Sequence, residues 1–252
     1  MTGLIVQDKT VVVPGEVIAE GIDYLPSYGS YREQDKIMAS QLGLLNIDGK
    51  VLKIIPLAGR YLPRRNDVII AKVVDILMTG WRLEINSPYT AVLNLKDASF
   101  DYIARGADLS KYFNLEDYMV TKIVNVTSQN IIDVSCKGPG LRGLRGGRVI
   151  RVSSCKVPRI IGKKGSMVSM IKRATGCQIT VGQNGFVWIN GEPDKEILVV
   201  EVINKVQREA HIQGLTERIQ KFLEEKTGNK IEIIEEKDEY ESSEQSEYSQ
   251  EN

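Results

Sequence analysis

Residues 159–176 read RIIGKKGSMVSMIKRATG and place a short loop of glycine and lysine between two apolar segments. Gly162 and Gly165 lack a Cβ atom, so the backbone there can approach another molecule closely. Lys163 and Lys164 add two positive charges on flexible side chains. The residues that follow read as the first turns of a helix, whose N–H groups and dipole favour a phosphate. Together these features predict a binding site for a phosphate-bearing chain.

The charge is unevenly distributed, although the net charge is zero. No Asp or Glu occurs between Val134 and Gly191, and this basic stretch holds eleven Lys and Arg residues. They are Lys137, Arg142, Arg145, Arg148, Arg151, Lys156, Arg159, Lys163, Lys164, Lys172 and Arg173. The first 133 residues are nearly balanced, with 14 basic and 16 acidic side chains. Because a block of one sign attracts a polymer of the other sign, we expect the basic stretch to bind nucleic acid.

Other kinds of chemistry find little support in the sequence. The three cysteines, Cys136, Cys155 and Cys177, form no CxxC pair, which argues against a zinc site and against a disulfide framework. The single histidine, His211, falls in a charged, helical stretch and leaves few general-base schemes open. We therefore expect no catalytic residues, no metal and no cofactor.

Targeting signals are also lacking in the sequence pattern. No apolar run approaches the ~18 residues that a membrane span needs. The N-terminal MTGLIVQDKT does not have the basic-then-apolar form of a signal peptide. We therefore expect no membrane association and a cytoplasmic location.

Hydrophobic periodicity divides the 252 residues into four parts. Residues 1–63 read as short β-segments separated by turns and predict a small β domain. Residues 64–140 read as five strands, which suits an OB-type barrel. Residues 147–226 mix strands and helices, and residues 227–252 are acidic, rich in Glu, Ser and Tyr, and predicted to be disordered. The expected fold class is multidomain, mainly β plus α/β.

The third part has the order strand, short helix, GKKG loop, helix, two strands and helix, and a final helix, LTERIQKFLEE, follows Gly214. This order resembles the KH domain, in which a GXXG loop clamps nucleotide backbones. Residues Met167, Met170, Ile171 and Ala174 recur at helical spacing and predict the buried face of the helix after the loop. The resemblance implies RNA contacts from Arg159, Gly162, Lys163, Lys164, Gly165, Ser166, Lys172 and Arg173.

A second GXXG-like sequence, GQNG at residues 182–185, joins two predicted strands. Asn and Gly tolerate positive φ, so we interpret this sequence as a structural turn and not as a second RNA clamp. Trp188 alternates with Phe186 along the following strand, and we expect it in the core.

The second part resembles the S-one-type OB repeat, an RNA-binding barrel named after a ribosomal protein. The stretches NDVI (residues 66–69) and AVLNLKDAS (residues 91–99) carry the resemblance, with Asn94 in the place of a family histidine. The long connection 97–116 holds four aromatic residues, Phe100, Tyr102, Tyr112 and Phe113. Such barrels bind on the second and third strands and adjacent loops. The resemblance therefore implies RNA contacts from Trp81, Arg82, Lys96 and Lys122, with Asn94 beside them.

The order of the domains resembles the RNA-binding cap subunit of the archaeal exosome, over residues 5–226. Its most specific segments are PGEVI, GRYLPRRNDVI and GQNGFVWING. The resemblance implies a non-catalytic role: three copies on a hexameric phosphorolytic nuclease ring, docked through the N-terminal domain. Single-stranded RNA would be captured by the cap and guided 3′ end first into the ring.

Two alternatives remain open at this point. A transcription antitermination or elongation factor also places an S-one-type barrel before KH domains, but normally carries two KH domains in tandem. Polynucleotide phosphorylase, an enzyme, combines the same modules in the reverse order behind catalytic domains that this chain lacks. The basic stretch contains no carboxylates that could form a metal-dependent nuclease site.

Overall fold

The structure is a computed structural model that describes residues 3–104, 106–210, 212 and 214–228. His211 and residues 229–252 of the predicted acidic tail lie outside the described residues. The chain forms two compact units, Met1–Tyr61 and Leu62–Asn252.

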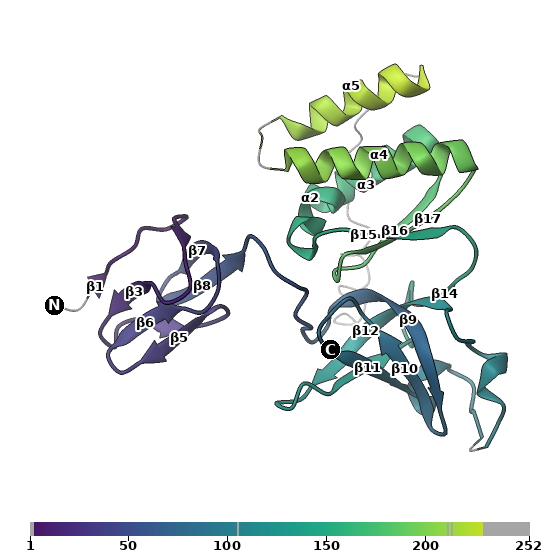
Figure 1. Cartoon of the computed structure of the whole chain (residues 1–252), viewed down its shortest axis with the longest axis horizontal. Helices are drawn as coiled ribbons and strands as arrows, with labels where there is room; N and C mark the ends of the chain where they lie inside the picture. The colour runs from purple at the N-terminus through teal and green to yellow at the C-terminus, as the bar shows by residue number, and fades with distance from the viewer. Residues whose placement is uncertain (1–2, 105, 211, 213, 229–252) are drawn as a thin grey trace, which may run out of the picture. The chain divides into compact units, whose positions relative to one another are not determined.

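The first unit is a small β domain built from two four-stranded sheets (Figure 1). One sheet has the order β1-β3-β6-β5 and the other β2-β7-β8-β4. The strands are β1 (Gly3–Leu4), β2 (Val11–Val12), β3 (Val17–Glu20), β4 (Leu25–Pro26), β5 (Ser30–Glu33), β6 (Lys36–Ala39), β7 (Gly43–Asp48) and β8 (Val51–Pro56). Their inward residues, among them Ile18, Ile37 and Leu45, form one buried core. The predicted β domain is confirmed.

The second unit begins with a closed five-stranded barrel. The strands are β9 (Val68–Leu77), β10 (Gly80–Glu84), β11 (Thr90–Asn94), β12 (Tyr118–Val126) and β13 (Ile132–Ser135). Their order is β13-β11-β10-β9-β12, and pairing of β13 with β12 closes the barrel. A short strand, β14 (Gly143–Leu144), extends the sheet beyond β12. The long connection between β11 and β12 contains a helical turn, α1 (Leu95–Ala98), and a 3-10 turn, η1 (Leu109–Lys111). The five predicted strands are confirmed.

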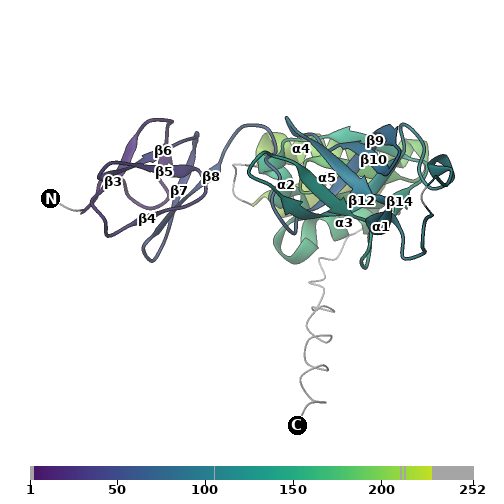
Figure 2. The ribbon, with the colours of Figure 1, turned by 90° about the horizontal axis from the view of Figure 1, so that it is seen from below.

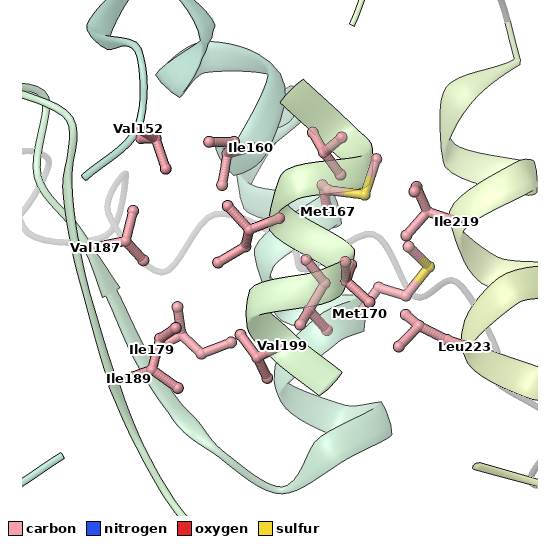
Figure 3. Packing of buried hydrophobic residues seen from close by; sticks show 14 of the residues in the cluster. Val152, Ile160, Met167, Met170, Ile179, Val187, Ile189, Val199, Ile219 and Leu223 are labelled. Atoms are coloured by element: carbon pink, nitrogen blue, oxygen red, sulfur yellow. The ribbon is translucent and has the colours of Figure 1, made fainter. Parts of the chain in front are cut away.

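The remainder of the second unit is an α/β domain. Its sheet has the antiparallel order β15-β17-β16, from β15 (Arg148–Arg151), β16 (Gln178–Val181) and β17 (Phe186–Asn190). Its helices are α2 (Val157–Ile161), α3 (Ser166–Thr175), α4 (Pro193–Glu209) and α5 (Leu215–Thr227), with a 3-10 turn η2 (Ser154–Lys156) before α2. The core lies between sheet and helices, where Val187 and Ile189 face Val199 and Met170 (Figure 3). This is the element order that the sequence predicts.

The sheet of the α/β domain is covered on both faces. The helices lie on one side of it and the barrel on the other (Figure 1). In the perpendicular view, strands β9, β10 and β12 lie in front of the helices, which agrees with this layering (Figure 2). The strands of the sheet therefore bury side chains in two directions, and residues 186–189 are all buried.

The GQNG turn joins the α/β domain to the barrel. Asn184 is 0% exposed, and its Nδ2 donates to the carbonyl oxygens of Ile70 (2.7 Å) and Ile85 (2.9 Å). Its Oδ1 accepts from the Ile70 N–H at 3.3 Å. Beside it, the Val68 N–H donates to Gln183 Oε1 at 2.6 Å. A Cβ atom on Gly182 would lie 2.7 Å from the Ile70 nitrogen, so only glycine allows this approach. The interpretation of GQNG as a structural turn is confirmed.

An apolar cluster surrounds this junction. It combines Ile70, Val120 and Leu144 of the barrel sheet with Phe186 and Trp188 of β17. The Trp188 Nε1–H donates to the Gly146 carbonyl oxygen at 2.8 Å, so the indole is both buried and hydrogen-bonded. The prediction that Trp188 lies in the core is confirmed, and the barrel and the α/β domain pack as one body.

Candidate nucleic-acid interface

The GKKG loop is a sharp turn between two helices. Helix α2 ends at Ile161, and Gly162 follows with φ 78° and ψ 175°. Lys163–Gly165 form a 3-10 turn, η3, in which Lys164 has left-handed angles of φ 50° and ψ 33°. Gly165, at φ 79°, is the N-cap residue of α3 and has no side chain with which to cap it. The loop therefore presents its backbone at the positive end of the α3 dipole.

The two glycines of the loop have different roles. A Cβ atom on Gly162 would lie 2.7 Å from both the nitrogen and the Cβ of Met167, so a side chain there would collide with α3. A Cβ atom on Gly165 would meet nothing within 4 Å. Gly162 is thus required by packing as well as by its positive φ. Gly165 leaves an open surface where another chain can approach.

The loop is accessible. Lys163 and Lys164 are exposed, as are Arg159 on α2 and Lys172 and Arg173 on α3. Gly162, Gly165 and Ser166 are half-buried. The opposite face of α3 is held in the core by Met167, Met170 and Ile171, with Ala174 packed at the margin. The eight predicted residues lie on one continuous segment, α2–loop–α3, and six of them surround the loop. Lys172 and Arg173 lie in the last turn of α3, where Arg173 lines a pocket with Asp194 and Glu201 of α4.

The rest of the basic stretch is less available than its sequence indicates. Carboxylates from other parts of the chain pair with Arg148 and Arg151: Arg148 Nε lies 3.2 Å from Glu196 Oε2, and Arg151 Nη2 lies 2.6 Å from Glu84 Oε1. Lys156 Nζ donates to the carbonyl oxygen of Gln207 at 2.9 Å. These three cations hold the fold together, so the basic surface is narrower than the eleven residues in the sequence.

Among the predicted barrel contacts, the prediction that Trp81 contacts RNA is wrong. Its side chain is 0% exposed, its Nε1–H donates to the Phe113 carbonyl oxygen at 3.1 Å, and its ring packs edge-on against Phe113. Because β10 points this position into the closed barrel, the indole cannot reach a base. Arg82 is exposed, and its Nη1 lies 3.6 Å from Asp75 Oδ2. Lys96 on α1 and Lys122 on β12 are exposed as well.

Sequence reasoning missed a cavity of about 620 Å³ on the barrel. Lys96 lines it together with Phe100, Tyr102 and Lys137. The signal was present, since the connection after β11 is rich in aromatic residues. Which of its rings point outward could not be read from the sequence.

Reactive groups do not gather elsewhere in the described ranges. Within them, no three His, Cys, Asp or Glu side chains are arranged to hold a metal ion. Burial, together with the Asp97 charge, raises the pKa of the Cys136 thiol to about 12. In the part of the chain that the structure describes, no helix combines the length and apolarity needed to cross a bilayer.

Comparison with known proteins agrees with this geometry. The family described as KH domain matches residues 147–195, and the family described as Exosome RNA binding protein RRP4 N-terminal domain matches residues 9–58. The chain is 41% identical over 230 residues to Exosome complex component Rrp4 of Methanothermobacter thermautotrophicus, covering 91% of this chain and 73% of the relative. It is 40% identical over 227 residues to the Rrp4 of Pyrococcus furiosus, covering 88% and 86%.

A solved structure is similar as well. It is a crystal structure of a protein assigned as an exosome complex RNA-binding protein, with a TM-score of 0.61 and 32% identity. The match covers 66% of this chain and 97% of that chain.

Proposed function

The chain belongs to the Rrp4 family of exosome complex components, and we propose that it is a non-catalytic cap that captures single-stranded RNA. In this role it guides the 3′ end of the RNA into a ring that degrades RNA from that end. The proposal rests on one observation above all. The GKKG loop is exposed at the start of α3, with basic residues on both sides of it.

The loop binds the RNA backbone through three features. The open surface at Gly165 admits the sugar–phosphate chain. The α3 dipole favours a phosphate there, and Lys163 and Lys164 add positive charge. Contacts of this kind depend little on base identity, so we expect slight sequence preference.

The first unit supplies the docking surface for the ring. Several of its apolar side chains are exposed, among them Ile5, Val13, Ile22 and Leu25. Residues 1–133 carry no excess of positive charge, which suits a protein contact better than a polyanion. We expect three copies of the chain on a hexameric phosphorolytic ring in the cytoplasm, and no contact with a membrane.

The test is charge reversal in the loop of the full chain, Lys163→Asp with Lys164→Asp. Asp tolerates the left-handed angles of position 164, so the fold should persist. The matched control is Lys50→Asp with Lys53→Asp, which changes the net charge equally on the first unit, where both lysines are exposed. Binding of single-stranded RNA should weaken in the loop variant alone. Unchanged affinity would remove the loop from the mechanism.

Two further measurements address the assembly and the absence of catalysis. The tagged chain should co-purify with a phosphorolytic ring in a ratio of three copies per six ring subunits. The isolated chain, given RNA, phosphate and magnesium, should not shorten the RNA. Robust turnover by the isolated chain would contradict the non-catalytic role.

A further inference from the structure

The connection after β11 exposes two aromatic rings that line the same cavity. The side chains of Phe100 and Tyr102 are 80% and 89% exposed. Both line the cavity on the barrel, together with Asn94, Lys96, Asp101 and Lys137. Two large rings left this open in one short segment indicate a ligand, because aromatic surface is normally buried.

The segment that carries the rings is anchored at both ends. Ala98 and Ile103, on either side of it, are buried. The Cys136 N–H donates to the Asp97 carbonyl oxygen at 2.8 Å and fixes α1 to the end of β13. Between the anchors, the Asp101 N–H donates to Ser99 Oγ at 3.1 Å. The rings therefore extend from a short, fixed loop, so that ordering them around a ligand costs little conformational entropy.

The composition of the cavity favours a nucleotide over a protein surface. Lys137 Nζ lies 5.9 Å from the centre of the Phe100 ring, and Lys96 lines the same cavity. The centre of a protein-docking patch is usually depleted of charge, whereas this cavity mixes aromatic rings with two ammonium groups and a carboxylate. A nucleotide matches this composition. Its base can stack on the aromatic rings, and its phosphate can pair with the ammonium groups. An amino group on the base edge can donate a hydrogen bond to Asp101.

We propose that Phe100 and Tyr102 form a base-stacking platform for single-stranded RNA, with Lys96 and Lys137 holding the adjoining phosphates. This rests on the proposed function, since it takes RNA as the ligand. It also explains how the barrel can stack bases although Trp81, the aromatic residue of β10, is buried inside it. The rings come instead from the connection that follows β11.

The experiment compares two probes on the full chain: a single-stranded oligoribonucleotide, and a strand of equal length whose central nucleotides are abasic. Phe100→Leu with Tyr102→Leu keeps apolar side chains but removes the π faces. This double variant should bind the base-bearing strand about 5- to 150-fold more weakly for each base that no longer stacks. Its affinity for the abasic strand and its salt dependence should stay as in the wild type.

Two controls separate stacking from charge. Lys96→Ala with Lys137→Ala should weaken the binding of both strands. It should also reduce the slope of log affinity against log salt concentration by about 0.7 for each phosphate that is no longer neutralised. Tyr31→Leu alters a partly exposed ring on β5 of the first unit, and should change neither affinity. Both rings of the platform are on the surface, and circular dichroism should show an unchanged fold.

The outcomes are distinguishable. In one outcome the wild type binds RNA, and the loop variant Lys163→Asp/Lys164→Asp has a lower affinity whereas Phe100→Leu/Tyr102→Leu does not. The platform is then wrong, while the proposed function stands. If the wild type binds neither strand, the platform and the proposed function both fail. If the double variant keeps its RNA affinity but no longer co-purifies with the ring, the surface docks a protein and the platform is overturned.

Discussion

Asn184 should carry much of the attachment between the barrel and the α/β domain. Its amide makes three hydrogen bonds to the barrel, with the carbonyl oxygens of Ile70 and Ile85 and with the Ile70 N–H. All three partners belong to residues that are fully buried, so water cannot replace the amide. At about 1–1.5 kcal/mol for each bond, Asn184→Ala should lower the free energy of unfolding by about 3–4.5 kcal/mol.

The free energy of unfolding is measured by urea denaturation, which is monitored through tryptophan fluorescence under selective excitation. The sequence has two tryptophans, and both Trp81 and Trp188 lie in the second unit, so the signal reports on that unit alone. Asn204→Ala is the control, because Asn204 is exposed on α4. It should change the free energy of unfolding by no more than about 0.5 kcal/mol.

A second substitution tests the direction of the hydrogen bonds. Asn184→Asp keeps the shape and the acceptor, but at neutral pH it places a buried negative charge against two carbonyl oxygens. The loss of stability should be at least as large as for Ala, and it should shrink as the pH falls, because a neutral carboxyl can donate. A loss below about 1 kcal/mol in both variants would refute the assignment of the junction to this amide.

Three other predictions concern charge and burial. If the chain neutralises four or five phosphates, the logarithm of its RNA affinity should fall against the logarithm of salt concentration with a slope of about −3 to −3.5; a slope near zero, measured by fluorescence anisotropy, would exclude backbone binding. Because burial raises the pKa of Cys136 to about 12, a thiol reagent at neutral pH should spare it and label the half-buried Cys155; mass spectrometry checks this, with the unfolded chain as control. The Arg218 and Lys205 side chains lower the pKa of Glu209, the last residue of α4, so its contribution to stability is present above the ordinary carboxyl pKa and lost as the pH falls through the lowered value. Glu209→Gln should therefore unfold more easily than the wild type at neutral pH but not in strong acid, whereas Glu225→Gln, an exposed α5 carboxylate, should show no such difference.

The sequence by itself determined the type and order of the main elements of the barrel and the α/β domain, and the position of the GKKG loop. These features depend on near neighbours: the apolar period of α3 is complete within ten residues. Gly162 and Gly165 adopt a positive φ, and the ability to tolerate such a φ is a property that glycine carries wherever it stands. For the same reason the GQNG sequence was recognisable as a turn between two strands before its surroundings were known.

Only the tertiary structure decided which of the candidate side chains are exposed and which are buried or paired. Trp81 alternates with polar neighbours, and closure of the barrel put it inside, while the rings of Phe100 and Tyr102 were left outside. Arg151 looks like part of a free basic surface until the fold brings Glu84, 67 residues away in sequence, to within 2.6 Å. Asn184 meets Ile70 across 114 residues. Contacts at such separations arise because strands distant in the chain share one packed interface, and no local pattern encodes which side chains meet there.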